Sequence, residues 1–244
     1  MADRSQPGEV VAGDQRAGDG ETGRSPLDRL GVLAMQSVAV DDQLDHLEIY
    51  TLEGLLTVLW HGPAEAERAV ICVGGAMGGL LGPDGGLFHR LGRELAPLGI
   101  GVLRVGYRQP NDLHLCVHDA LAMMELAARH GAKRFVTMGH SFGGAVAVQA
   151  AAHLDRQSVP GVVTLATQSA GCEAIENLAD RDLLFFHGTA DRILPHQASE
   201  MVRMLAGAGE LVLVDGADHL LEPAGEEILA RLVDHLPTVL DRPD

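Results

Sequence analysis

Short, continuously apolar runs alternate with longer amphipathic stretches along most of this sequence. The runs are AVICVGG, GVLRVGY, RFVTMGH, GVVTLAT, DLLFFHG and ELVLVDG. Most of them are followed by a stretch with apolar residues at three- and four-residue spacing, which is typical of a helix. Strands that are apolar on both sides belong in a parallel sheet with helices on both faces. The alternation therefore predicts one doubly wound α/β domain with right-handed crossovers.

Two further runs precede these, HLEIYTL and LLTVLWHG, joined by a Glu-Gly turn. They predict an N-terminal antiparallel hairpin, so that the sheet has about eight strands. The segment between GVVTLAT and DLLFFHG is short, which predicts a domain with no large lid. Residues 1–26 are rich in Gly, Asp, Arg and Pro and have no periodicity, so we expect a disordered tail before a domain at 27–244.

Composition limits the possible partners. The formal net charge of −16 argues against nucleic acid, whose binding requires Lys and Arg to neutralise phosphates. The three cysteines are far apart and form no CxxC pair, which indicates a reducing compartment. Neither a signal-peptide core nor a long apolar span is present, so we expect a cytoplasmic protein without a membrane span. The oligomeric state is not set by any of these features.

Three chemically significant side chains each follow a different predicted strand. Ser141 comes directly after RFVTMGH, Asp191 follows DLLFFHG, and His219 follows ELVLVDG. In open α/β sheets the chemistry lies at the carboxyl ends of the strands. A serine hydroxyl is a weak nucleophile that needs a base, and an imidazole titrates in the required range. The order predicts a triad in which His219 activates Ser141 and Asp191 orients His219.

Other interpretations remain open for some of these residues. A serine between glycines is also found in tight strand-to-helix turns that have no catalytic role. Asp215 and Asp218 flank His219 and compete with Asp191 as the orienting acid. His187, at the end of DLLFFHG, is interpreted as a packed, hydrogen-bonded neighbour rather than a base.

Gly139-His140-Ser141-Phe142-Gly143 fits the G-x-S-x-G nucleophile elbow, and the layout of residues 46–236 resembles the α/β-hydrolase superfamily. HGTADRILP and GADH look like the acid and histidine motifs of its small serine esterases and dienelactone-hydrolase-like members. The sequence departs from that pattern in two places. Gly74-Gly75 stands where the family often has His-Gly. The segment RVGYRQP keeps Arg108 but replaces the usual Asp and Gly of Asp-x-Arg-Gly.

The resemblance implies an oxyanion hole formed by the backbone N–H groups of Phe142 and Ala76. Gly75 and Met77 are the neighbours that a one-residue shift of the alignment would select instead of Ala76. We name them with His140 and His196 as possible pocket lining, and a place on a helix surface is an equal alternative for His196. The glycine-rich GGAMGGLLGPDGG lacks the end of a phosphate-binding P-loop, which disfavours nucleotide binding. His114 and His118 have helical spacing but no third ligand nearby, so no metal site is predicted.

We therefore expect a serine hydrolase that cleaves a carboxylic ester or thioester of a small-molecule acyl substrate through an acyl-enzyme. No metal or organic cofactor is expected. One alternative is the same fold carrying out acyl transfer, elimination or cyclisation, because a fold does not determine one chemistry. Another is a ligand-binding protein without catalytic activity.

Overall fold

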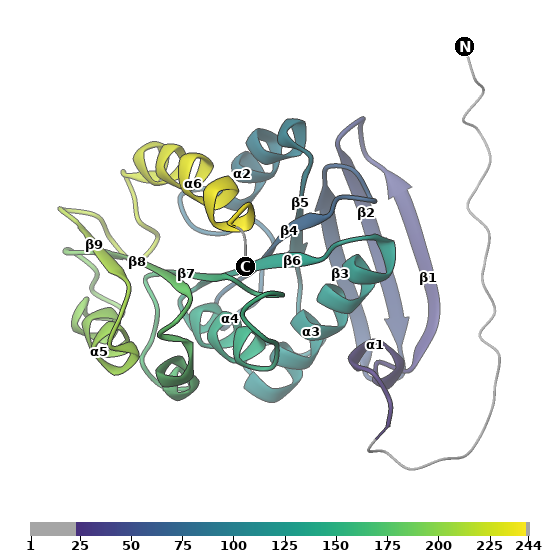
Figure 1. Ribbon diagram of the computed structural model, residues 1–244, viewed down its shortest axis with the longest axis horizontal. Coiled ribbons are helices and arrows are strands. Elements are labelled where there is room, and N and C mark those ends of the chain that lie inside the picture. Colours follow the sequence, from purple (N-terminus) through teal and green to yellow (C-terminus); the bar gives the residue numbers. More distant parts are fainter. Residues whose placement is uncertain (1–22, 243–244) are drawn as a thin grey trace.

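The structure is a computed structural model that describes residues 23–242. Most of the predicted tail at 1–26 lies outside the described residues, and helix α1 begins at Pro26. Within the described range, nine strands form one sheet in the order β1-β2-β3-β5-β4-β6-β7-β8-β9 (Figure 1). The strands are β1 (Val32–Ala39), β2 (Leu44–Thr51), β3 (Gly54–His61), β4 (Arg68–Val73), β5 (Ile100–Val105), β6 (Arg134–His140), β7 (Gly161–Leu165), β8 (Asp182–Gly188) and β9 (Glu210–Val214).

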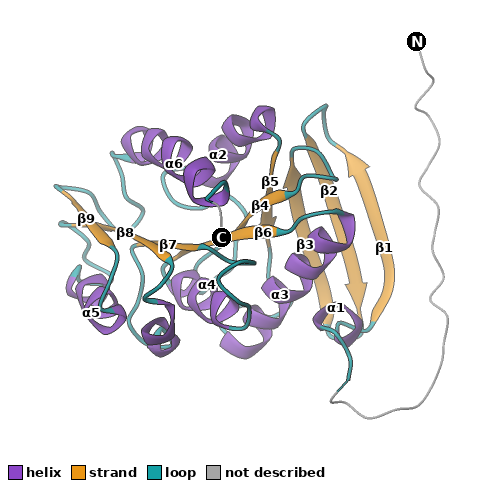
Figure 2. Ribbon diagram, in the orientation of Figure 1, coloured by secondary structure: helices purple, strands orange, loops and turns teal. Residues whose placement is uncertain are grey.

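Helices fill most of the connections between the parallel strands (Figure 2). They are α1 (Pro26–Arg29), α2 (Leu87–Leu95), α3 (Leu113–His130), α4 (Phe142–Ala152), α5 (Gln197–Ala206), α6 (Gly225–Leu240) and the 3-10 helices η1 (Ala96–Leu98) and η2 (Glu173–Leu178). None of the helices described here is long and apolar enough to cross a membrane. The connection between β7 and β8 holds only η2, in agreement with the absence of a large lid predicted at this point.

Strand pairing confirms the predicted sheet. Strands β4 to β9 pair only in parallel with one another, and β2 and β3 form the predicted antiparallel hairpin. The hairpin turn is one residue earlier than expected, at Leu52 and Glu53, because Gly54 already pairs with Thr51. The sheet has one strand more than predicted. This strand, β1, pairs only with β2 at the edge of the sheet and is largely exposed, so it lacks the pattern of a buried strand.

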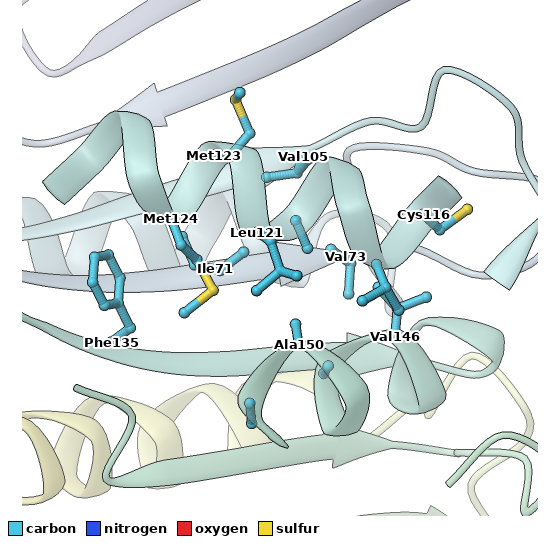
Figure 3. Packing of buried hydrophobic residues seen from close by; sticks show 14 of the residues in the cluster. Ile71, Val73, Val105, Cys116, Leu121, Met123, Met124, Phe135, Val146 and Ala150 are labelled. Atoms are coloured by element: carbon cyan, nitrogen blue, oxygen red, sulfur yellow. The ribbon is translucent and has the colours of Figure 1, made fainter. Parts of the chain in front are cut away.

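The two faces of the sheet are covered by different helices. Helices α2 and α6 lie on one face, and α3, α4 and α5 lie on the other (Figure 1). Because successive side chains of a strand point to opposite faces, Val70 and Cys72 pack under α2 and α6, whereas Ile71 and Val73 pack against α3 and α4. Figure 3 shows this second layer, with Ile71 near Leu121 of α3. The continuous apolar runs are thereby explained.

The segment after β5 is fixed to α3 by a buried ion pair. Arg108 Nε donates to Asp119 Oδ1 at 2.5 Å, and the Arg108 backbone N–H donates to Asp119 Oδ2 at 2.9 Å. Neither side chain is exposed to solvent. Arg108 Nη1 also donates to Glu53 in the hairpin turn at 2.7 Å. This arginine, the one that the sequence retains from the family segment, therefore joins three elements of the fold.

Asp119→Ala is expected to destabilise the protein by about 3–5 kcal/mol, because it removes the buried carboxylate that pairs with the guanidinium and leaves the Nε–H and the backbone N–H of Arg108 without an acceptor. Glu67→Ala is the matched control, since Glu67 pairs with Lys133 at the surface and both side chains are well exposed. Urea unfolding followed by circular dichroism measures both. Equal midpoints for the two variants would show that the Arg108–Asp119 pair contributes little to stability.

Candidate active site

The turn between β6 and α4 holds Ser141 in a backbone conformation that side chains rarely adopt, with φ 56° and ψ −121°. The turn is tight because the chain passes very close to itself. A Cβ on Gly139 would lie 1.8 Å from the carbonyl oxygen of Gly143, and one on Gly143 would lie 2.3 Å from that of Gly74. Only glycine fits at these two positions. The turn directs Ser141 away from the sheet at the carboxyl end of β6.

Ser141, His219 and Asp191 form a hydrogen-bonded chain. The Ser141 Oγ lies 3.1 Å from His219 Nε2, and His219 Nδ1 lies 2.7 Å from Asp191 Oδ2. An ionised carboxylate only accepts hydrogen bonds, so Nδ1 carries the proton and Nε2 is free to accept from the serine hydroxyl. The fold thus brings together the three residues that the sequence singles out, from the ends of β6, β8 and β9.

Asp191 is held by four donors. Its Oδ1 accepts the backbone N–H groups of Ile193 at 2.8 Å and Leu194 at 2.9 Å. Its Oδ2 accepts from His219 and also lies 3.2 Å from His187 Nε2. Burial alone raises the pKa of this carboxyl, but the hydrogen bonds from Leu194, His219 and Ile193 outweigh it and hold the pKa of Asp191 below 3.8. The carboxylate is therefore charged at neutral pH despite being fully buried.

His187 is buried behind Asp191 and is fixed at both ring nitrogens. Its Nδ1 lies 2.6 Å from the Oγ of Ser199 in α5, and its Nε2 faces the carbonyl of Leu194 at 3.1 Å as well as Asp191. Both neighbours of Nε2 are acceptors, so Nε2 carries the proton and the Ser199 hydroxyl donates to Nδ1. Burial lowers the pKa of His187, which keeps the ring neutral in this arrangement.

A second buried histidine supports the loop that carries His219. His140 Nε2 lies 2.9 Å from the backbone carbonyl of His219, to which it donates. Burial lowers the pKa of His140 to about 4, so its ring is also neutral at neutral pH. His140 thus hydrogen-bonds to the backbone of His219 and also packs beside its ring, with 5.0 Å between the ring centroids.

The loop after β4 lies beside Ser141. A Cβ on Gly75 would be 3.7 Å from the Ser141 Cβ, and the Gly78 backbone N–H donates to the Gly75 carbonyl at 2.9 Å in a tight turn. Ala76 lies within this turn. Phe142 is the first residue of α4, so its backbone N–H has no acceptor within the helix. Both backbone segments named as oxyanion donors therefore border Ser141.

Tyr107 is a supporting residue that the sequence analysis does not identify. Its hydroxyl donates to the Gly74 carbonyl at 2.8 Å, and its ring meets that of Phe142 edge to face, 6.2 Å between centroids. Tyr107 thereby links the loop after β4 to the start of α4. The aromatic residue after a strand is the only signal in the sequence, and it does not reveal the contact with Gly74.

In the described part of the chain, the other residues that the sequence analysis considers for the site make no hydrogen bond with the Ser141 hydroxyl or the His219 ring nitrogens. Met77 is highly exposed in the loop after β4. His196 contacts Gln197 and Glu200 at the start of α5, and its polar contacts do not include the Ser141–His219–Asp191 chain. Asp218 Oδ1 accepts the backbone N–H of Leu220 at 2.8 Å. Asp215 Oδ1 accepts from Thr189, so the carboxylate facing the His219 ring is that of Asp191.

Of the histidine pair of α3, His118 has a structural role. His118 Nε2 donates to the Pro26 carbonyl at 2.8 Å, and its Nδ1 accepts from Arg108 at 3.0 Å. Within residues 23–242, His, Cys, Asp and Glu side chains form no group of three or more arranged to hold a metal ion.

The model of the alpha/beta hydrolase family matches residues 87–221, more than half of the chain. The chain belongs to this family. The matched range includes Ser141, Asp191 and His219, whereas the loop after β4 precedes it. A comparison with curated proteins finds no match.

Among solved structures, this hydrolase is similar to dienelactone hydrolase from Anabaena variabilis, with a TM-score of 0.66 and 18% identity over 85% of this chain and 99% of that chain. It is similar to Est1E from Butyrivibrio proteoclasticus, with a TM-score of 0.65 and 16% identity over 81% and 99%. It is also similar to a serine hydrolase without a lid from Xanthomonas campestris, with a TM-score of 0.63 and 18% identity over 85% of this chain and 100% of that chain. At these identities the likeness shows the fold.

Proposed function

We propose that this protein is a serine hydrolase that cleaves a carboxylic ester or thioester of a small acyl substrate in the cytoplasm. The observation that carries the proposal is the hydrogen-bonded chain from Ser141 through His219 to a buried, ionised Asp191. The strained turn at Ser141 supports it, because such backbone strain is concentrated at functional sites. The fold shared with hydrolases of known structure, two of them described as dienelactone hydrolase and serine hydrolase, supports it further.

In the proposed reaction, the Ser141 Oγ attacks the carbonyl carbon while His219 Nε2 takes the hydroxyl proton. The resulting oxyanion accepts hydrogen bonds from the backbone N–H groups of Phe142 and Ala76. Each such donor is worth about 3 kcal/mol of transition-state stabilisation. His219 then gives its proton to the leaving alcohol or thiol, and the acyl group stays on Ser141. Water, deprotonated by His219, attacks the acyl carbon. The bond from this carbon to the Ser141 Oγ breaks, the carboxylic acid leaves, and His219 returns the proton to Ser141.

The nucleophile is tested with a fluorophosphonate probe and a panel of acyl esters and thioesters. The protein is expected to be labelled once and to hydrolyse at least one class of substrate, because the probe reacts only with an activated serine. Ser141→Ala is expected to lose both labelling and hydrolysis. Equal labelling of Ser141→Ala would disprove the assignment. Labelling without hydrolysis of the panel would indicate that a nucleophile other than water takes the acyl group.

The orienting acid is tested by comparing Asp191→Asn with Asp218→Asn. An amide at 191 places an N–H opposite Nδ1 and favours the wrong tautomer of His219, so kcat is expected to fall about 10³- to 10⁴-fold. At 218 the amide keeps an oxygen that can accept the Leu220 N–H, so activity is expected to stay close to that of the unchanged protein. The kcat of purified variants with matching circular dichroism spectra decides between them, and the opposite ranking would reassign the acid to Asp218.

His187 is proposed to position Asp191. Removal of its N–H in His187→Leu is expected to lower kcat about tenfold or more, since a donor to a buried charged group is lost, while KM changes little. His187→Gln returns an N–H at the same distance along the side chain and is expected to recover most of the rate.

His61→Leu is the matched control for this series. His61 is equally buried and lies on β3 against Gly92, and among residues 23–242 neither of its ring nitrogens has a hydrogen-bond partner. It is expected to change stability without changing the rate at which the fluorophosphonate labels Ser141. A purely structural role of His187 predicts instead that the labelling rate is unaffected in His187→Leu, as in the control.

A further inference from the structure

Four large apolar side chains are exposed in the loops that hold the proposed catalytic groups. They are Met77 (92% exposed), Ile193 (71%), Leu81 (58%) and Leu220 (45%). Met77 and Leu81 come from the loop after β4, Ile193 from the loop after β8, and Leu220 from the loop after β9. Solvent exposure of apolar side chains is unremarkable when they are scattered singly, but neighbouring ones mark binding sites. The question is therefore whether the loops that carry these four side chains lie together.

Hydrogen bonds join the three loops beside Ser141. Asp191 in the loop after β8 accepts from His219 in the loop after β9 at 2.7 Å. The Ile193 N–H donates to Asp191 Oδ1, and Leu220 directly follows His219. The Asp84 backbone N–H donates to the Leu220 carbonyl at 2.9 Å, which ties the segment after Leu81 to the His219 loop. Met77 is two residues beyond Gly75, whose Cα faces the Ser141 side chain. We call these four side chains the apolar rim.

The apolar rim offers no surplus of positive charge. Along the chain, Arg192 precedes Ile193 and Asp218 lies two residues before Leu220, and these two side chains have opposite signs. Arg90, near the Leu81 segment, is paired with Asp84. The whole chain has a formal net charge of −16, which repels polyanions such as acyl-coenzyme A. An uncharged aliphatic chain is the group that gains most from contact with such a rim, since it leaves water without losing a charge's hydration.

We propose that the apolar rim binds the aliphatic acyl chain of an uncharged ester, so that the protein prefers medium-chain over short-chain acyl groups. This inference rests on the proposed function, because the rim acts on a substrate whose carbonyl is held at Ser141. The rim residues determine specificity. Because their backbone atoms hold the site and their side chains point to solvent, their side chains can be exchanged without removing the hydrogen bonds around Asp191.

The test measures kcat/KM for p-nitrophenyl acetate, butyrate and octanoate below their micellar concentrations. Each methylene that leaves water in the transition state raises kcat/KM by about fourfold, so the octanoate is expected to exceed the acetate by about tenfold or more. Met77→Ser, Ile193→Ser and Leu220→Ser are each expected to lower the octanoate-to-acetate ratio by about threefold or more. Met77→Leu, which keeps an apolar side chain of similar size, is expected to keep the ratio.

Met204→Ser is the matched control, because Met204 is 72% exposed but lies on α5 outside these loops. It is expected to leave both rates and their ratio unchanged. A flat series in the unchanged protein, rim variants that behave like Met204→Ser, or a higher kcat/KM for octanoyl-coenzyme A would each overturn the inference. Failure of the proposed function itself is distinct, since Ser141→Ala would then hydrolyse the esters as fast as the unchanged protein.

Discussion

The close approach of three backbone segments at the end of β6 is the constraint on which the site depends. Gly139, Gly143 and Gly74 meet where any side chain would collide with a carbonyl oxygen. This contact lets α4 begin directly after the strand and leaves Ser141 at a positive φ. It also fixes the loop after β4 next to the nucleophile, because Gly74 belongs to that loop. The same contact thus sets the serine and the neighbouring backbone donors in one place.

The second requirement is a carboxylate that stays ionised in a buried position. Burial disfavours the ionised form of Asp191. Two backbone N–H groups donate to one of its carboxylate oxygens, and two imidazoles lie at the other, which offsets this effect. Charge-assisted hydrogen bonds of this kind are about twice as strong as neutral ones. The two acceptors at Nε2 set the tautomer of His187, and Ser199 of α5 donates to the other ring nitrogen, so a helix beside the sheet helps to hold the ring that donates to Asp191.

The sequence predicts the parallel part of the sheet well because each buried strand is a continuous apolar run between turns. It also predicts that Ser141, Asp191 and His219 lie together, since each follows a strand and the ends of parallel strands share one edge of the sheet. Strand β1 is not predicted, because it is an exposed edge strand and lacks the buried face that an apolar pattern would reveal. The contact of Tyr107 with Gly74 and that of Ser199 with His187 arise only from packing between elements distant in the chain, which local patterns do not encode.

In the loops of the site, backbone groups form the hydrogen bonds while several apolar side chains are exposed to solvent. In the loop after β8, the N–H groups of Ile193 and Leu194 bind Asp191, while the Ile193 side chain faces solvent. In the loop after β9, the Leu220 carbonyl accepts from Asp84 while its side chain is partly exposed. A substitution of either side chain leaves these backbone hydrogen bonds available. In the proposed function, the backbone of the fold therefore holds the groups around Ser141, whereas the proposed choice of acyl group rests on a few exposed side chains.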